Sequence, residues 1–332
     1  MKKVLFKVDA SEDIGYGHFF RCLNLAKFLY ANNYDISFLC QSEKGNINHI
    51  IPKEFHKIET NIFGYVDPSE VISIIRNKSI DFLIMDNYEI DYFYEKAILE
   101  QTSVKYLALD DIGREHYCDI IVDQNINAHE SQYINDRVKK VLCGLEYVIL
   151  GNHFLSNIEN IKPRKSINKV LVFFGGSDMT QETKKVLDAL CECDYNLNFT
   201  VISKEAKELR ELYHNLKNIS YFEFVDNMAT TMLEHDLMFG AYGTTTWERF
   251  YLGLPSACVT IADNQEENAK YLTQKELVTF VGDGRFTTSN DWIRVIQSIA
   301  SESSRYIKNS KKILELVDGR GLTRIKEEME KL

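Results

Sequence analysis

The sequence predicts an α/β protein built from two Rossmann-like domains that face a central cleft. Short apolar runs alternate with helical patterns, which is typical of parallel strands joined by crossover helices. This alternation occurs twice in 332 residues, more than one hydrophobic core usually holds. The polar segment 156–168, "SNIENIKPRKSIN", contains one of only four prolines and separates the two blocks. We therefore expect one domain over 1–155 and a second over 166–332.

The first block predicts six strands, at 3–8, 35–40, 80–86, 104–109, 119–122 and 141–143. Its predicted helices are 18–32, 67–78 and 91–101. The second block predicts strands at 169–174, 197–202, 219–222, 236–239 and 256–260, with helices near 180–192, 204–215, 227–234, 244–252 and 264–276. The stretch 290–332 is also helical, and we expect one of its helices to cross back to the first domain. Ligands of such sheets bind at the carboxyl ends of the strands.

The composition excludes several classes of function. The net charge is −10 and there is no basic stripe, so we expect no nucleic-acid partner. The seven cysteines include no CxxC pair, and Cys191 and Cys193 are too close for a normal zinc pair, so we expect buried free thiols and no metal. No stretch suits a bilayer or a signal peptide, so we expect a cytoplasmic protein without membrane insertion. The oligomeric state is not predicted.

The first strand leads into "DASEDIGYGHFFRCLNLAKFL", a glycine-rich turn at the start of a helix. Gly15 and Gly17 allow positive φ and close approach of a phosphate or a sugar oxygen. His18 then lies at the helix N-terminus, which favours the neutral imidazole that a general base requires. The alternative is a histidine that only satisfies the turn. Arg21, one helical turn later, either holds an anion beside His18 or forms a surface ion pair.

Two turns of the second domain have the size of a phosphate site. In "VLVFFGGSD" a buried strand is followed by Gly175, Gly176 and Ser177. The alternative is an ordinary strand-to-helix loop with Asp178 near a helix cap. In the first domain, the turn with Gly15 and Gly17 does not match the dinucleotide fingerprint GxGxxG.

In "FGAYGTTTWERFYLGLP" a strand ends in glycines, and Thr244, Thr245 and Thr246 begin a helix. Their hydroxyl and amide groups suit a pyrophosphate, and Glu248 suits a ribose diol. A threonine N-cap with a glutamate capping box is compatible with the same residues.

The segment "ADNQEENA" begins another helix with side-chain amides. Asn264 and Gln265 either face the cleft or cap this helix. The pair Asp110 and Asp111 is interpreted as a strand-end structural pair or a substrate contact.

Seven motifs occur in one order along the chain: "DASEDIGYGHFFRCLNLA", "MDNY", "LDD", "DQN", "FGGSD", "YGTTTWERFYLGLP" and "DNQEENA". Together they resemble the UDP-2,4-diacetamido-2,4,6-trideoxy-β-L-altropyranose hydrolases of pseudaminic acid biosynthesis, the PseG family. The resemblance covers nearly the whole chain and includes the terminal "DGRGLTRI". It implies a GT-B-like fold, similar to the transferase that adds N-acetylglucosamine to lipid intermediate I, and no cofactor.

The resemblance also implies roles for individual residues. His18 matches a histidine regarded as the base that activates water, and Tyr88 matches a tyrosine near the sugar and the water. Asn264 matches an asparagine near the phosphates, and Glu248 matches the ribose-binding glutamate of the transferases. The segment "FVDNM", with Val225 and Met228, lies where those transferases hold the uracil ring. Asn87 stands where some members have histidine.

These residues predict hydrolysis of a UDP-sugar with inversion at the anomeric carbon. Water polarised by His18 attacks, the C–O bond breaks, and UDP leaves without a metal or paired carboxylates. Asp9 and Tyr88 orient the sugar or His18, and the glycine and threonine turns receive the pyrophosphate. The alternatives are a glycosyltransferase on the same fold, a hydrolase for a related nucleotide-linked diacetamido sugar, and a non-enzymatic nucleotide-sugar sensor.

Overall fold

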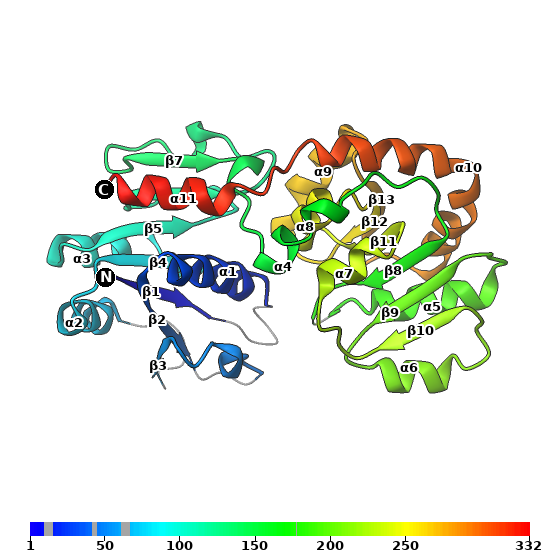
Figure 1. Cartoon of the computed structure of the whole chain (residues 1–332), viewed down its shortest axis with the longest axis horizontal. Helices are drawn as coiled ribbons and strands as arrows, with labels where there is room; N and C mark the ends of the chain where they lie inside the picture. Colours follow the sequence, from blue (N-terminus) through cyan, green and yellow to red (C-terminus); the bar gives the residue numbers. More distant parts are fainter. Residues whose placement is uncertain (10–15, 42–44, 61–66, 177) are drawn as a thin grey trace. The chain divides into compact units, whose positions relative to one another are not determined.

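The computed structural model describes residues 1–9, 16–41, 45–60, 67–176 and 178–332. Gly15 and Ser177, both predicted site residues, lie outside the described residues. The chain divides into two compact units, Met1–Asn152 with Gly319–Leu332, and His153–Asp318 (Figure 1). The domain boundary predicted from the sequence places the last 14 residues in the second domain. In the structure they pack in the first unit instead. This position corresponds to the C-terminal helix that was expected to cross back.

The first unit contains a parallel sheet of seven strands in the order β3-β2-β1-β4-β5-β6-β7. Its strands are β1 (Lys2–Val8), β2 (Tyr34–Gln41), β3 (His56–Thr60), β4 (Phe82–Asp86), β5 (Lys105–Leu109), β6 (Ile120–Asp123) and β7 (Lys140–Cys143). The chain reverses its direction of winding between β1 and β4, which lie side by side in parallel. Loops at such a reversal diverge and leave room for a ligand at the carboxyl ends of the strands.

The helices of this unit are α1 (Gly17–Ala31), α2 (Pro68–Lys78), α3 (Tyr92–Gln101) and α11 (Gly321–Glu330), and the short α4 (Asn152–Leu155) leads into the second unit. Side chains of α2 and α3 join the sheet in one buried apolar cluster, whereas α1 and α11 contact each other on the other side (Figure 1). The Asp67 and Asp91 carboxylates cap α2 and α3 by accepting from backbone N–H groups.

The second unit contains six parallel strands in the order β10-β9-β8-β11-β12-β13, with a reversal between β8 and β11. The strands are β8 (Lys169–Phe173), β9 (Asn198–Ile202), β10 (Ile219–Phe222), β11 (Leu237–Ala241), β12 (Ser256–Thr260) and β13 (Thr279–Asp283). The helices are α5 (Glu182–Glu192), α6 (Ala206–Leu212), α7 (Met228–Leu233), α8 (Thr245–Tyr251), α9 (Glu266–Gln274) and α10 (Ser289–Leu314). This is the strand order of dinucleotide-binding Rossmann domains.

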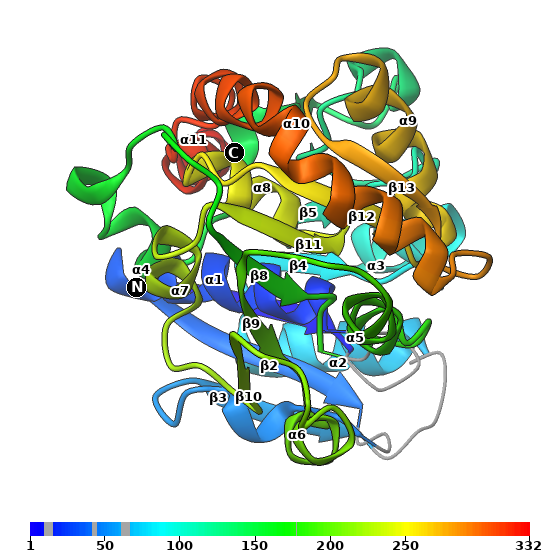
Figure 2. The same ribbon diagram turned by 90° about the vertical axis from the view of Figure 1, so that its right-hand side faces the viewer.

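The core of the second unit forms around Trp292 of α10, a helix that packs against β13 (Figure 2). The Trp292 ring contacts Phe174 and Phe239, and its Nε1 donates to the buried Glu182 carboxylate at 2.8 Å. Helices α5, α6 and α10 pack in this cluster with inward side chains of β8, β9, β10, β11 and β12. Within the ranges that the structure describes, no helix is both long enough and apolar enough to span a bilayer.

Candidate functional site

Polar residues gather at the carboxyl end of the first sheet, at the reversal between β1 and β4. His18 is the second residue of α1 and Asp86 is the last residue of β4. His18 Nδ1 lies 2.6 Å from Asp86 Oδ1. Gly17 is the first residue of α1, where its backbone φ is not positive, so the predicted need for positive φ does not apply there.

The Asp86 carboxylate fixes the tautomer of His18. Burial alone would raise the pKa of Asp86, but the charges and hydrogen bonds of Arg21 and His18 together outweigh burial and hold this pKa well below its usual range. An ionised carboxylate only accepts hydrogen bonds, so Nδ1 of His18 carries the proton and donates to Asp86. Arg21 Nη2 also lies 3.0 Å from Nδ1, and it donates to Asp86 at 2.7 Å. In the neutral imidazole Nε2 then carries the lone pair, and it has no hydrogen-bond partner among the described residues. This is the arrangement of a general base oriented by a carboxylate.

Arg21 holds an anion beside His18, but that anion is the Asp86 carboxylate of the protein itself. Its guanidinium is buried, so it is not a surface ion pair, and it binds two carboxylates of the protein. Nε and Nη2 donate to Asp86 at 2.5 and 2.7 Å, and Nη1 donates to Asp111 at 3.1 Å. Because these donors are already used, Arg21 is reassigned from binding a ligand anion to holding Asp86 and Asp111 in place.

Tyr88 follows β4 and joins the same cluster. Its hydroxyl donates to Asp111, and its ring meets that of His18 edge to face with centroids 4.8 Å apart. The Arg114 guanidinium lies 5.5 Å from the centroid of the Tyr88 ring. Tyr88 is 38% exposed, so this side chain reaches solvent beside His18. Asp111, which the sequence left between a structural and a contact role, links Tyr88 to Arg21.

Asp9 lies apart from His18, contrary to one of its predicted roles. Its buried carboxylate pairs with Lys7 and accepts from the Gln41 backbone N–H at 2.9 Å and from Asn87 Nδ2 at 3.1 Å. No described contact joins it to His18, which is oriented by Asp86 instead. Asp9 therefore holds β2 and the loop after β4 around the end of β1.

A second layer of charged groups supports the loops beneath Tyr88. Arg114 Nε donates to Asp110 at 2.9 Å, and its Nη1 donates to three carbonyl groups of the loop after β4, at Asn87, Tyr88 and Ile90. Asp110 also accepts from the backbone N–H groups of residues 113 and 114. Asp110 is therefore structural, whereas its neighbour Asp111 faces the His18 cluster.

In the second unit, the turn after β8 is partly closed by the protein itself. Gly175 has φ +94°, a left-handed conformation that favours glycine. The Asp178 carboxylate accepts from the backbone N–H groups of Glu182 and Thr183, both at 2.9 Å. These donors at the start of α5 are therefore occupied, which corresponds to the cap alternative. Gly175 and Gly176 remain candidates through their own backbone.

The turn after β11 keeps its polar groups available. The N–H groups of Gly243, Thr244 and Thr245 have no acceptor among the described residues, and Thr244 makes no capping hydrogen bond. Thr246 differs from its prediction: its N–H donates to Gly243 and its buried hydroxyl accepts from Arg249, so neither faces a ligand. This leaves a short row of free donors at the carboxyl end of β11.

Glu248 is half-buried on α8, and in the described structure its carboxylate has no hydrogen-bond or ion-pair partner. Burial raises its pKa to about 7, against a smaller opposite effect of Arg249. The predicted capping box is not formed. The side chain is therefore free to accept hydrogen bonds from a ligand.

The other predicted nucleotide contacts lie on neighbouring loops. The Gln265 carbonyl accepts from the Ile261 backbone N–H at 3.0 Å, and its Nε2 lies 3.9 Å from the position of a Cβ on Gly243. Asn264 is in the same 3-10 turn, Asp263–Gln265. Val225 and Met228 lie half-buried at the start of α7.

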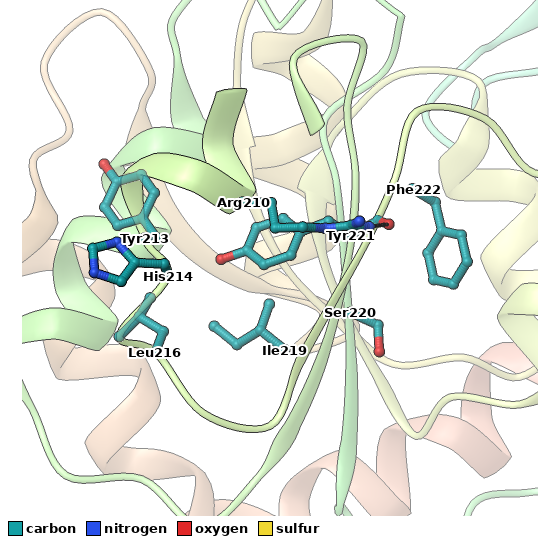
Figure 3. A pocket seen from close by; sticks show the side chains of 8 residues that line it. All are labelled: Arg210, Tyr213, His214, Leu216, Ile219, Ser220, Tyr221 and Phe222. Atoms are coloured by element: carbon teal, nitrogen blue, oxygen red, sulfur yellow. Dashed lines mark hydrogen bonds between the residues drawn. The ribbon is translucent and has the colours of Figure 1, made fainter. Parts of the chain in front are cut away.

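A hollow of about 410 Å³ lies elsewhere, along the edge strand β10 (Figure 3). Arg210, Tyr213 and His214 line it beside Tyr221 and Phe222. None of the predicted site residues lines it, so it is separate from both reversal points.

Comparisons with known proteins agree with this architecture. Residues 170–325 match the glycosyltransferase family 28 C-terminal domain. The UDP-2,4-diacetamido-2,4,6-trideoxy-β-L-altropyranose hydrolase of Campylobacter jejuni is 28% identical over 283 residues, 82% of this chain and 97% of that protein. The uncharacterized protein MJ1062 of Methanocaldococcus jannaschii is 28% identical over 76% of this chain, which spans 54% of that protein.

Among solved structures, Acinetobacter baumannii MurG superposes over the whole of both chains with a TM-score of 0.72 at 14% identity. At that identity the likeness concerns the fold. The two parallel sheets with interleaved helices are therefore those of the GT-B fold, as the sequence predicted.

Proposed function

We propose that this chain, an enzyme of the GT-B superfamily, hydrolyses a UDP-linked 2,4-diacetamido-2,4,6-trideoxy sugar to the free sugar and UDP. The observation that carries the proposal is the pair of His18 and Asp86, which leaves His18 Nε2 without a partner in the described residues. The likeness to the Campylobacter hydrolase and the motifs shared with its family support the choice of substrate.

In this reaction His18 Nε2 accepts a proton from water while the water oxygen attacks the anomeric carbon. The bond between that carbon and the diphosphate oxygen breaks, and its electron pair leaves with UDP. Attack opposite the leaving group inverts the anomeric configuration. Asp86 stabilises the imidazolium that forms, and Tyr88 is placed to contact the sugar.

The second unit supplies the nucleotide contacts in this proposal. The free N–H groups of residues 243–245 donate to the diphosphate, and Glu248 accepts from the ribose hydroxyls. Gly175, Gly176, Asn264 and Gln265 border the same end of the sheet, and Val225 and Met228 contact the uracil ring. A diphosphate is already a good leaving group, so positioned hydrogen-bond donors can supply most of the stabilisation of its developing charge.

The test is hydrolysis of the UDP-linked sugar in ¹⁸O-water with EDTA present and no acceptor. We expect release of UDP, ¹⁸O in the sugar and none in the phosphate. His18→Ala should lower kcat by about 10²-fold or more, since a general base contributes about that factor. His153→Ala, at a histidine of the second unit, is the matched control and should leave kcat unchanged.

A glycosyltransferase is the second candidate, favoured by the family 28 match over residues 170–325. It would use the same nucleotide contacts and pass the sugar to an acceptor hydroxyl in place of water. If the protein binds the UDP-sugar but releases UDP only when an acceptor is added, the transferase is correct and His18 activates that hydroxyl.

A further inference from the structure

Arg249 on α8 is a buried guanidinium without a carboxylate partner. Its exposed fraction is 0%, and no carboxylate of the described residues pairs with it. Nη1 and Nη2 both donate to the Ala241 carbonyl at 3.1 Å, and Nη2 donates to the Thr246 hydroxyl at 2.9 Å. Its Nε has no hydrogen-bond partner in the described structure. The charge of Arg249 acts on Glu248 without forming an ion pair. A buried charge without an ion-pair partner is unfavourable, so its retention needs an explanation.

This guanidinium lies where β8 and β11 end. A Cβ on Gly240, near the end of β11, would lie 3.0 Å from Arg249 Nη1 and 3.0 Å from the carbonyl oxygen of Phe173, the last residue of β8. A side chain larger than glycine at position 240 would therefore contact the guanidinium too closely. Arg249 is therefore placed beneath the turns that begin at Gly175 and Gly243.

Another buried arginine of the same unit shows the contrast. Arg164 donates to four carbonyl groups, at Lys162, Met232, His235 and Leu252. Burial lowers the pKa of Arg164 to about 10, with Asp236 acting against it. The carbonyl of His235 precedes β11, so Arg164 lies at the amino end of that strand. These four hydrogen bonds explain how the buried charge of Arg164 is stabilised. Arg249 donates to one carbonyl only, and its Nε has no hydrogen-bond partner in the described structure.

We propose that Arg249 is a positioning residue that supplies the positive charge for the diphosphate bound at residues 243–245. This inference rests on the proposed function and adds the charge of Arg249 to the groups that bind the diphosphate. Arg249 fixes the turn through the Ala241 carbonyl and the Thr246 hydroxyl. Its field acts strongly over several ångströms because the guanidinium is fully buried.

The same charge favours the leaving group over the substrate. When the C–O bond breaks, the diphosphate gains one negative charge, so the interaction with a fixed cation becomes stronger as the reaction proceeds. Arg249 therefore has a larger effect on UDP than on uridine or on the UDP-sugar. Ligand charge is thus the variable that separates this role from simple packing.

The experiment measures the affinities of UDP, UMP and uridine by calorimetry for the wild type, Arg249→Gln and Arg249→Lys, at about pH 8.5 so that Glu248 is mainly ionised in each. Glutamine keeps an N–H donor for the Ala241 carbonyl but removes the charge, and lysine keeps the charge. We expect R249Q to weaken UDP binding by about 10- to 100-fold, UMP less and uridine by less than about 2-fold, whereas R249K loses less than about 5-fold for UDP. Thermal melting of every variant reports folding.

Arg164→Gln is the matched control, since it also removes a buried guanidinium of this unit. It should lower the melting temperature with equal effects on the three ligands. Equal losses of UDP and uridine in R249Q, or unchanged UDP affinity in that variant, would overturn the proposal. If R249Q does not fold, R249K tests the proposal. Equal losses of affinity for uridine and UDP in R249K would mean that Arg249 acts by packing alone. If the wild type binds none of the three ligands, the proposed function fails first and the inference with it.

Discussion

His18 Nδ1 lies 2.6 Å from Asp86 Oδ1, and this contact determines which nitrogen of His18 is available for chemistry. Asp86 is ionised and its other oxygen binds Arg21, so the imidazole is held by its protonated Nδ1. The base in the proposed reaction is therefore Nε2. The contact joins the first turn of α1 to the end of β4, two segments 68 residues apart.

Asp86→Asn should lower kcat by about 10²-fold or more, because an amide can present an N–H to Nδ1 and stabilise the wrong tautomer. It also removes a carboxylate from Arg21, so we expect a lower melting temperature. Steady-state hydrolysis and thermal melting measure the two effects separately.

Asp119→Asn provides the comparison for stability. Asp119 is a buried carboxylate of the same unit that pairs with Arg137 and Lys139, away from His18. This variant should lose stability while kcat stays within about 2-fold of the wild type. Equal losses of kcat in D86N and D119N would mean that Asp86 acts only through folding.

Tyr88 and Asp111 should behave as one unit. The Tyr88 hydroxyl donates to Asp111, which also binds Arg21, so removing either partner frees the Tyr88 ring beside His18. We expect Tyr88→Phe and Asp111→Asn each to lower kcat by about 10-fold, and the double variant to be no slower than the slower single one. A double-mutant cycle on kcat measures this coupling. Additive losses would show that the two residues act independently.

The binding of a ribose should depend on pH through Glu248. Burial raises the pKa of this carboxyl to about 7, so it is mainly protonated at pH 6 and mainly ionised at pH 8. The ionised form accepts two hydrogen bonds from a diol, so affinity should rise with pH across this range, by up to about 10-fold. Uridine is the suitable ligand because it has no phosphate that titrates here.

Glu248→Gln is the control for that titration, since the amide does not ionise. Its affinity for uridine should be lower than that of the wild type at pH 8 and constant between pH 6 and 8. A wild-type affinity that does not change with pH would remove Glu248 from the ribose site.

The sequence predicts the central strands well because they are continuous apolar runs, such as Val4–Phe6 in β1. It does not predict β3 or β13, two edge strands in which Thr60 of β3 is the only buried residue; "HKIET" also contains no apolar run. The sequence proposes His18 from its position after a glycine turn. Its partner Asp86 was missed, although the motif "MDNY" contained it, because only the neighbouring position of β1 and β4 brings the two together.

Arg21 and Asp9 flank the glycine turn, so the sequence assigns them to a ligand or to His18. In the structure Arg21 pairs with Asp86 and Asp111, which are distant in sequence. Asp9 pairs with Lys7 of its own strand and also accepts from the distant Gln41 and Asn87. The periodicity of one segment contains no information about partners that other segments supply. A useful signal was present: a buried strand that ends in Asp, as β4 does, usually has a polar partner at the same sheet edge.

Gly321→Ala tests how the last helix is held in the first unit. A Cβ at this position would lie 2.7 Å from the backbone N of Val148 and 2.7 Å from the carbonyl carbon of Tyr147, which are backbone atoms that cannot rotate away. Helix α11 would have to move, and its buried Leu322, Ile325 and Met329 would lose their packing. We expect a loss of about 2 kcal/mol or more in the free energy of unfolding, measured with urea. Glu327→Ala, on the exposed side of the same helix, should change it by less than about 0.5 kcal/mol, and equal effects of the two substitutions would mean that the close approach at Gly321 does not hold α11.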